Sequence, residues 1–325
     1  MRGAYVCTGI LLLSCGLAAQ STDWEARFKR GVELHRQGDY QAAFELLNEM
    51  VRDPHSGATP RQRERAMMSL GALYHELGQD SQASRIYTRV LRDVEARAGR
   101  RNGDYALLLS NLATIDLWAK RYDKAEPRIR EAISIYEASA AQDDVRLAVA
   151  RNALGEILVA RKQYAEAEDL LRSARATLQG KLGEGERTAI TINNLAASRR
   201  TQGHVQEALV LFQEAVEMTE RALGRRHPHT ARALNNLAAA YADADRFREA
   251  ESAWRESLEI IEATLGQEHP VYGEVLQNYA HMLRRLGRKK EAKPLEARSK
   301  ALLAGAARAN GSAMTVDISE LSSFR

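Results

Sequence analysis

Cysteine and proline are scarce in this sequence, and each scarcity excludes a class of protein. The chain of 325 residues has 2 cysteines, Cys7 and Cys15. Because both lie near the start, no disulfide framework can hold the body of the chain together. The 6 prolines are few enough to permit long helices. Lys and Arg number 47 against 43 Asp and Glu, and so small an excess predicts no nucleic-acid partner.

The sequence also lacks the motifs of common enzyme classes. It has no G-x-S-x-G elbow and no G-x-x-x-x-G-K-[ST] phosphate loop. His75 begins a pattern similar to a zinc protease motif, but Gln79 stands where the second His would be. His227 and His229 are close enough to share a metal, yet His227 and His269 both precede Pro at equivalent places, which favours a structural role. We therefore expect no catalytic residue, no metal site and no cofactor, and we do not expect an enzyme.

The first 19 residues have the pattern of an export signal. An apolar run, AYVCTGILLLSCGLAA, is followed at once by the polar QSTDWEARFKR, and about sixteen residues are few for a membrane span. Cleavage after Ala19 would leave Gln20 as the first residue. Alternatively, LLSC ending at Cys15 resembles a lipoprotein signal, in which the Cys is lipidated. We expect a periplasmic or secreted protein, membrane-bound only if lipidated at Cys15; an uncleaved anchor or a cytoplasmic chain is the remaining alternative.

The rest of the chain repeats itself with a constant period. Segments such as GDYQAAFELL, KQYAEAEDLL and ADRFREAESAW contain an alanine at one equivalent position. The seven equivalent alanines are Ala43, Ala83, Ala125, Ala167, Ala208, Ala250 and Ala292. They lie 40 to 42 residues apart. A period this regular over seven copies predicts a solenoid of stacked repeats.

Within each copy, apolar residues follow a helical spacing on both sides of a short turn. In the sixth copy, Leu234, Leu237 and Tyr241 mark one face of a first helix, and Ala250 and Trp254 mark one face of a second helix. Small residues recur at one place in the first helix, where a bulkier side chain would keep two helices apart. They are Gly71, Ala113, Gly155, Ala196, Ala238 and Ala280. The pattern predicts an all-α array of helical hairpins.

These residues resemble the tetratricopeptide repeat, and the longer period resembles its kinesin light chain-like variety. The segments LGRRHPHTARALNNLAAAY at 223–241 and LGQEHPVYGEVLQNYAHML at 265–283 carry the resemblance most clearly. It implies a right-handed superhelical α-solenoid of about seven helix–turn–helix repeats over residues 24–306. Residues 307–325 would form a disordered tail. The resemblance implies a mode of binding only, since the chain lacks the other domains of a kinesin.

The resemblance further implies that the first helices line a concave groove that holds a peptide or a partner segment. The amide side chains expected there are Asn111, Asn152, Asn193, Asn194, Asn235, Asn236, Gln277 and Asn278. Amides both donate and accept hydrogen bonds, so a row of them suits the backbone of an extended peptide. In the related repeats such Asn residues take part in ligand binding. Alternatively, one Asn per copy bonds to the neighbouring helix and fixes the stacking.

One turn further along the first helices, the expected lining changes from apolar to cationic. Trp118 lies in the third copy, Arg200 in the fifth and Arg284 in the seventh. This gradient would suit a ligand with a hydrophobic segment followed by acidic residues. Trp118 is either an anchor for a partner or a residue packed between repeats, and the arginines are either ligand contacts or ordinary solubilising charge.

The sequence thus predicts an exported scaffold that binds an extended peptide or partner segment in its concave groove. The alternative is a passive assembly or structural protein of the cell envelope, with contacts outside the groove. In the tail, Met314-Thr315-Val316-Asp317-Ile318 alternates weakly between apolar and polar residues. We expect disorder there, and a segment that occupies its own groove or binds a partner is the alternative.

Overall fold

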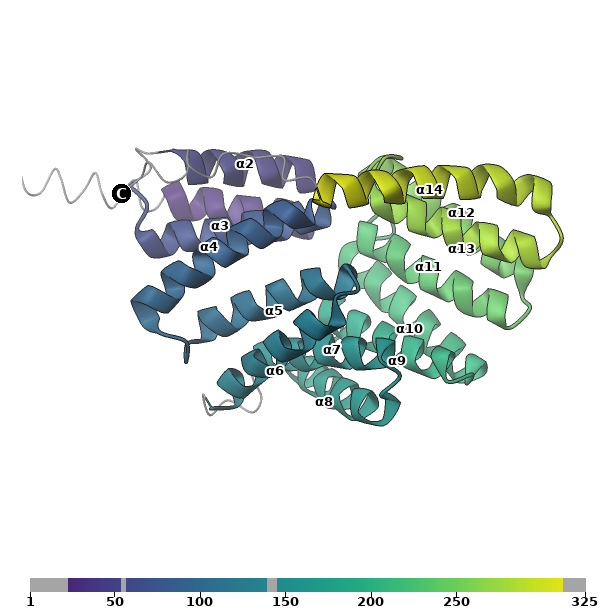
Figure 1. Ribbon diagram of the computed structural model, residues 1–325, viewed down its shortest axis with the longest axis horizontal. Coiled ribbons are helices and arrows are strands. Elements are labelled where there is room, and N and C mark those ends of the chain that lie inside the picture. Colours follow the sequence, from purple (N-terminus) through teal and green to yellow (C-terminus); the bar gives the residue numbers. More distant parts are fainter. Residues whose placement is uncertain (1–22, 54–56, 139–144, 312–325) are drawn as a thin grey trace, which may run out of the picture.

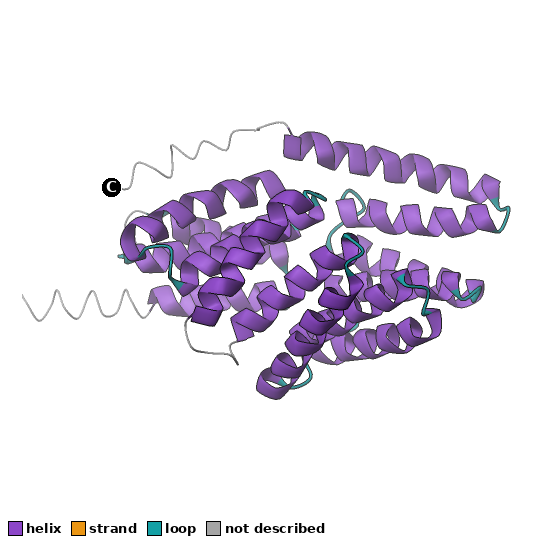
Figure 2. Cartoon of the chain, turned by 60° about the horizontal axis from the view of Figure 1, so that its bottom comes forward, coloured by secondary structure: helices purple, strands orange, loops and turns teal. Residues whose placement is uncertain are grey.

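The computed structural model describes residues 23–53, 57–138 and 145–311. These residues fold into seven helical hairpins joined by short loops, with no strand among them (Figure 2). The first helices of the hairpins are α1 (23–36), α3 (Pro60–Glu76), α5 (Gly103–Trp118), α7 (Val145–Ala160), α9 (Glu186–Thr201), α11 (Pro228–Asp243) and α13 (Pro270–Arg285). The second helices are α2 (Tyr40–Arg52), α4 (Asp80–Ala98), α6 (Tyr122–Ala138), α8 (Tyr164–Leu182), α10 (Val205–Leu223), α12 (Phe247–Thr264) and α14 (Lys289–Gly311).

The sequence sets the ends of these helices by ordinary capping. Thr59 and Gln62 form a capping box at the start of α3, and Pro60 occupies the first turn, where its missing N–H is not needed. At the end of α10, Gly224 adopts a φ of 93° and its N–H bonds to the carbonyl of Glu220, a conformation that glycine adopts without a steric penalty.

The hairpins pack through the small residues that the sequence pattern singles out. All seven equivalent alanines of the second helices are fully buried, as are Ala113, Ala196, Ala238 and Ala280 of the first helices. Their lack of bulk lets the two helices of a hairpin approach closely, and each hairpin then covers the apolar face of the next. The core is therefore a continuous ribbon along the array, as the repeat pattern predicts.

The stacked hairpins wind into a right-handed superhelix whose two ends meet. Each first helix from α3 to α11 contacts the next first helix, so these helices form the inner, concave wall. The winding brings α14 against α4 (Figure 1). Helix α14 runs to Gly311, beyond residue 306, where the array was expected to end. The expected leader, residues 1–19, and the remainder of the expected tail, residues 312–325, lie outside the described residues.

The close approach at the small positions generates a test of the packing. A Cβ added at Gly71 would lie 2.7 Å from the Tyr87 ring, whereas one added at Gly180 would meet nothing within 4 Å. We expect Gly71→Ala to lower the free energy of unfolding by about 1–3 kcal/mol through overpacking. Gly180→Ala, the control, should raise it by about 0.5–1 kcal/mol because alanine favours helix. Urea unfolding followed by circular dichroism measures both, and equal stabilisation by the two variants would contradict this account.

Candidate partner-binding site on the concave side

Two turns of the first repeats dock against the starts of two late helices, and we call this contact the seam. The turn between α1 and α2 places Gly38 against His227 and Pro228, and the turn between α3 and α4 places Gly78 against Pro270. A Cβ at either glycine would lie 3.0 Å from those atoms. Both glycines also have positive φ, 79° and 73°, so a side chain would be strained at either position.

The histidines of the two His-Pro pairs serve the seam and the helix starts together. His227 Nδ1 accepts a hydrogen bond from the N–H of His229 at 3.1 Å, and His269 Nδ1 accepts one from Val271 at 3.3 Å. Each histidine therefore caps the helix that follows it. On its other ring nitrogen, His269 Nε2 lies 2.9 Å from the carbonyl oxygen of Glu76, across the seam. This arrangement confirms the structural role expected for these histidines.

A cluster of charged side chains next to the seam links α3, α9 and α11. The imidazole of His229 lies between two carboxylates, with Nδ1 2.8 Å from Glu186 Oε1 and Nε2 3.6 Å from Glu76 Oε1. Arg232 Nη1 lies 3.5 Å from the other oxygen of Glu76. The side chains of Glu76 and His229 are only 15% and 18% exposed. Charges removed this far from water require partners, so these side chains depend on one another.

The cluster shifts the pKa values of its histidines in opposite directions. Burial by itself lowers the pKa of His229, but hydrogen bonds to Glu186 and Glu76 outweigh burial and raise that pKa to about 9. Burial and the positive charge of His229 lower the pKa of His227 to about 4. Burial also acts to raise the pKa of Glu76, but Arg232 and His229 outweigh it and hold that pKa well below 4.5. At neutral pH, His229 is therefore cationic and His227 is neutral.

Trp118 extends from the end of α5 toward this cluster. The Arg232 guanidinium lies 4.5 Å from the centroid of the Trp118 ring, a cation–π contact. His75 packs edge-on against the same ring and its Nδ1 lies 2.6 Å from Asp80. Even so, 39% of Trp118 is exposed. The ring therefore packs between repeats, as one of the two expectations for Trp118 has it, and part of the ring is still exposed.

Two cavities flank Trp118 and share it as a lining residue. The first, of about 680 Å³, lies at the seam, and we call it the seam cavity. Its lining includes Trp118, Arg121, Arg232, Pro270, Glu274 and Leu303. The second, of about 430 Å³, lies along the ends of α5 and α7, and its lining includes Leu117, Trp118, Lys120, Val159 and Lys162. Apolar, cationic and acidic side chains therefore surround one partly exposed aromatic ring, since Glu274 lines the first cavity and Glu156 lines the second.

The expected row of amides exists, and most of its members bond to one another. Asn194 donates to Asn152 at 3.2 Å, Asn236 donates to Asn193 at 3.0 Å, and Asn278 donates to Asn235 at 3.1 Å. Each bond joins one first helix to the next. Asn235 Oδ1 also accepts from Trp254 Nε1 at 2.9 Å. These bonds favour the stacking role for the paired amides.

The other predicted residues lie in differing surroundings. Asn111 is half-buried and Gln277 is exposed. Arg200 Nε lies 3.7 Å from Asp243 Oδ2, and Arg284 Nε donates to Glu296 Oε1 at 2.6 Å. Both arginines are thus matched by acidic partners, and Arg284 links α13 to α14 rather than standing free.

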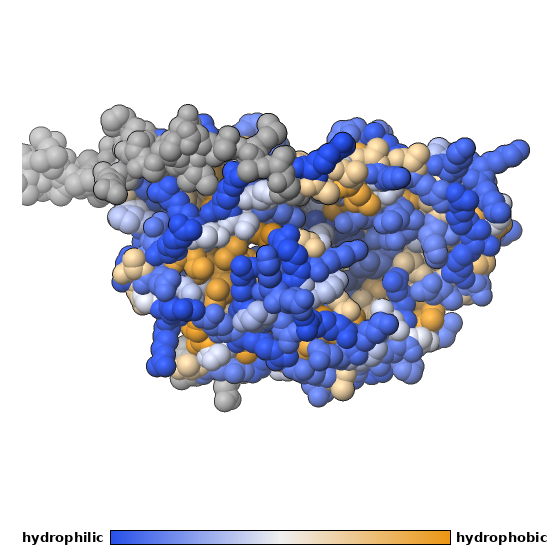
Figure 3. Space-filling view, in the orientation of Figure 1, coloured by the Kyte–Doolittle hydropathy of each residue, from blue (hydrophilic) through white to orange (hydrophobic). Residues whose placement is uncertain are grey.

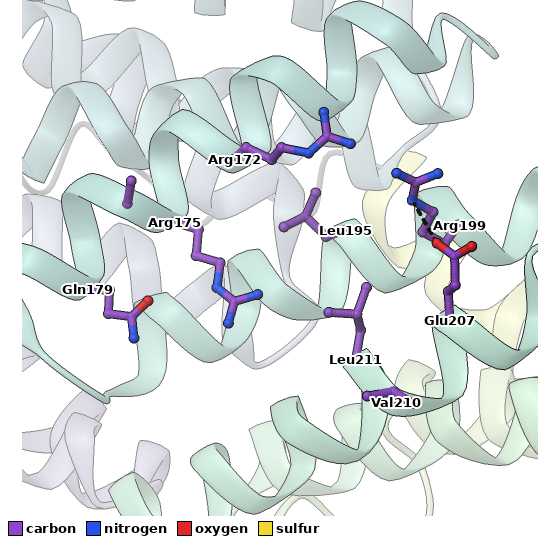
Figure 4. A pocket seen from close by; sticks show the side chains of 9 residues that line it. Arg172, Arg175, Gln179, Leu195, Arg199, Glu207, Val210 and Leu211 are labelled. Carbon is purple, nitrogen blue, oxygen red and sulfur yellow. Dashed lines mark ion pairs between the residues drawn. The ribbon is translucent and has the colours of Figure 1, made fainter.

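A further cavity lies away from the seam, between α8, α9 and α10. Figure 4 shows Arg172 and Arg175 on one side and Val210 and Leu211 on the other, and the volume is about 630 Å³. Val210 is 65% exposed. The arginines here have acidic partners; for example, Arg175 Nη2 donates to Glu214 Oε1 at 2.6 Å. We call this the outer cavity.

Three further findings concern the surface, metal binding and membrane spans. Figure 3 shows a mainly hydrophilic face interrupted by apolar patches over α14 and between α4 and α5. Within the described ranges, no group of three or more His, Cys, Asp or Glu side chains is placed to hold a metal ion. Among the same residues, no helix has both the length and the apolar character to cross a membrane.

Sequence analysis did not find the seam or its charged cluster. Glu76, Glu186 and Arg232 come from three different repeats, and no local pattern connects them. The glycines of the first two turns and the His-Pro pairs of the last two linkers are visible in the sequence and could have indicated the seam. The repeat pattern alone does not show that these glycines meet these His-Pro pairs.

The opposite pKa shifts predict a bounded range of maximal stability. The contribution of His229 is complete below its ordinary pKa of about 6.5 and is lost as the pH rises through about 9. The contribution of neutral His227 is present above about pH 6.5 and is lost as the pH falls toward 4. We expect the melting temperature to be highest near pH 6.5, where both contributions are present, and to fall toward pH 9 and toward pH 4. His229→Gln should remove on the order of 2 kcal/mol and flatten the alkaline decline.

Thermal melting by circular dichroism from pH 4 to pH 10 measures this dependence. His281→Gln, at an exposed position on α13, is the matched control and should keep the alkaline decline. An alkaline decline that persists unchanged in His229→Gln would show that other groups cause it.

Comparison with known proteins bears on the family. A profile of the tetratricopeptide repeat matches residues 104–179, 187–253 and 235–304, and a second profile of the same description matches 66–105. Protein kinesin light chain-related 2 of Arabidopsis thaliana is 22% identical over 176 residues. That match covers 54% of this chain and only 26% of the relative.

Solved structures with a similar fold include two peptide or factor complexes. A Rap protein complexed with competence and sporulation factor has a TM-score of 0.65 at 15% identity, over 94% of this chain and 80% of that one. NprR in complex with its cognate peptide NprX has a TM-score of 0.61 at 13% identity, over 84% and 76%. BtubC from P. vanneervenii has a TM-score of 0.49 at 22% identity, over 77% and 92%.

The repeat profiles together cover more than half of the sequence. The chain therefore belongs to the tetratricopeptide repeat family, and part of it is similar to a kinesin light chain-related protein.

Proposed function

We propose that this protein is a scaffold for protein–protein interaction that holds a short extended polypeptide segment on its concave side. One observation carries the proposal: two cavities at the end of the first helix α5 share Trp118, which is 39% exposed. Partly exposed aromatic rings beside apolar pockets are typical anchors of binding surfaces. The cavities, of about 680 and 430 Å³, suit side chains of a peptide better than a large folded partner.

The chemistry of the walls supports a ligand with apolar and acidic residues. Leu117 and Val159 offer apolar contact in the second cavity, and Lys120 and Lys162 stand beside them. The half-buried Asn111 and the exposed Gln277 extend the same wall with amide groups. A peptide backbone can bond to such amides whatever its side chains are. The amides that pair with each other would act by keeping the first helices in register.

The structural neighbours support a peptide ligand at the level of fold. The Rap protein and NprR share this architecture at TM-scores of 0.65 and 0.61. Their structures hold a factor and a cognate peptide, respectively. Fold alone does not fix function, so the proposal depends on the inner wall of this chain.

Peptides selected from a random library on the immobilised protein would test the proposal. We expect their binding to weaken at least tenfold in Trp118→Ala, because an anchoring aromatic contributes on the order of 2 kcal/mol. Val210→Ala, in the outer cavity, is the matched control and should bind them unchanged. Circular dichroism would first establish that both variants are folded. Selected peptides that tolerate Trp118→Ala and depend on Val210 would move the binding surface to the outer face.

The outer cavity supports a second candidate function, a structural or assembly role with contacts outside the groove. Val210 is exposed in that cavity, which Arg172, Arg175 and Glu207 also line. An apolar side chain ringed by charge is a feature of protein contact surfaces. The pairing of its arginines with acidic residues leaves less charge for a partner there than beside Trp118, and we therefore prefer the inner wall.

We propose in addition that the scaffold is exported, on the strength of its leader. The apolar run before Ala19 and the polar sequence after it support secretion to the periplasm or the medium. Intact-mass analysis of the protein recovered from cells provides the test. A chain that begins at Gln20 would support secretion, and an acylated Cys15 would support a lipid anchor. A full-length mass recovered from the cytoplasm would contradict export.

A further inference from the structure

The end of α14 lies at the seam cavity. Leu303, Ala306 and Ala307 of this helix line the cavity, opposite Trp118 and Pro270. Contact between α14 and α4 holds the helix there. Residues 312–325 begin five positions after Ala307 and lie outside the described residues. The chain that continues from α14 therefore starts beside the cavity that we assign to the ligand.

The sequence of residues 312–325, SAMTVDISELSSFR, has the chemistry that the cavity walls favour. Met314, Val316 and Ile318 alternate with polar residues, and Asp317 and Glu320 add negative charge. Alternation at this spacing would present apolar side chains on one side of an extended segment.

The facing walls combine an apolar side and a basic side. Trp118, Val271 and Leu303 form the apolar side of the seam cavity. Arg121 and Arg232 form its basic side, although Arg121 also donates to Asp116 at 2.7 Å and Arg232 lies 3.5 Å from Glu76. Beyond Trp118, the second cavity adds the two lysines at 120 and 162. The acidic Asp80 and Glu274 also line the seam cavity, and Glu156 lines the second cavity, so basic side chains outnumber acidic ones in each lining by a small margin.

Length and tethering favour this segment over a free ligand. Fourteen residues reach about 45–50 Å when extended, which is ample to cross a cavity of about 680 Å³ and pass over Trp118. A segment tethered by a short linker binds as though its concentration were in the millimolar range. A weak intrinsic affinity is therefore sufficient for occupancy.

We propose that residues 312–325 dock in the seam cavity and over Trp118 of their own chain, and so compete with any external peptide. This inference rests on the proposed function, because it assigns an occupant to the same inner wall. It makes the tail an autoinhibitory segment: an external ligand must displace it, and removal of the tail must increase the apparent affinity for such a ligand.

Trp118 provides a direct readout of occupancy. The chain has 3 tryptophans, and Trp24 and Trp254 are buried at 3% and 1% exposure. Quenching of fluorescence by acrylamide therefore reports mainly on Trp118. A chain that ends at Gly311 retains every helix of the described array, so truncation leaves the fold intact. We expect the quenching constant to rise at least twofold on truncation, and a synthetic peptide of residues 312–325 to restore the lower value.

Variants of the full chain separate docking from a general effect of chain length. Val316→Asp together with Ile318→Asp should raise the quenching constant as truncation does, because charge replaces the apolar contacts. Ser322→Asp together with Ser323→Asp adds the same charge outside the alternating stretch and should leave the constant unchanged. Protection must also be independent of protein concentration, since docking of the tail of a second copy would weaken on dilution.

Equal quenching of the full and truncated chains, with no binding of the 312–325 peptide, would overturn the docking of the tail. The library-selected peptides distinguish this failure from failure of the proposed function. If they bind both chains equally and depend on Trp118, the groove function stands and only the tail assignment falls. If they bind neither chain through Trp118, both inferences fall. Tighter binding to the truncated chain, by tenfold or more, is the result that we expect.

Discussion

The structure depends on one packing constraint, the close approach of two helices at a small residue. Ala43 and its six equivalents are fully buried, and each allows a second helix to lie flat against its first helix. Because the period hardly varies, each hairpin is rotated relative to the last by a similar amount. The rotation accumulates over the array. The curvature of the whole molecule therefore depends on how closely the two helices of each hairpin approach one another.

The seam is the consequence of that curvature at a particular repeat number. Repeats one and two return to repeats six and seven, and Gly38 and Gly78 meet two successive His-Pro pairs, at 227–228 and 269–270. The contact therefore occurs twice, and the two copies are one repeat apart on each side of the seam. The two ends therefore meet through two equivalent contacts, in each of which the turn of an early hairpin lies against the start of a late first helix. The buried carboxylates and His229 then fix the ends electrostatically, at a position where unpaired charges would be costly.

Sequence reasoning predicted the elements of the fold more completely than the site. The helix type and the buried alanines follow from the apolar pattern within each hairpin, and the repeat number follows from the period of 40 to 42 residues along the chain. The row of Asn residues was also visible, but its partners were not, because the bonds from Asn236 to Asn193 and from Asn278 to Asn235 join neighbouring repeats. The cluster of Glu76, His229 and Arg232 was beyond reach, since it depends on how far the superhelix turns over more than 150 residues. Small errors in the rotation of each repeat would accumulate and separate those side chains.

Arg232 connects the two functional features of the inner wall. Its guanidinium lies over Trp118 at 4.5 Å and within 3.5 Å of Glu76, so the same side chain belongs to the proposed ligand site and to the seam. A ligand that changes the position of Trp118 must change the surroundings of Arg232, and thereby the partner of a buried carboxylate. Linkage requires the reverse effect to be equal in free energy. Occupancy of the proposed ligand site and closure of the superhelix would therefore be coupled through Arg232, and a peptide bound at Trp118 would alter the stability of a contact made by the first two repeats.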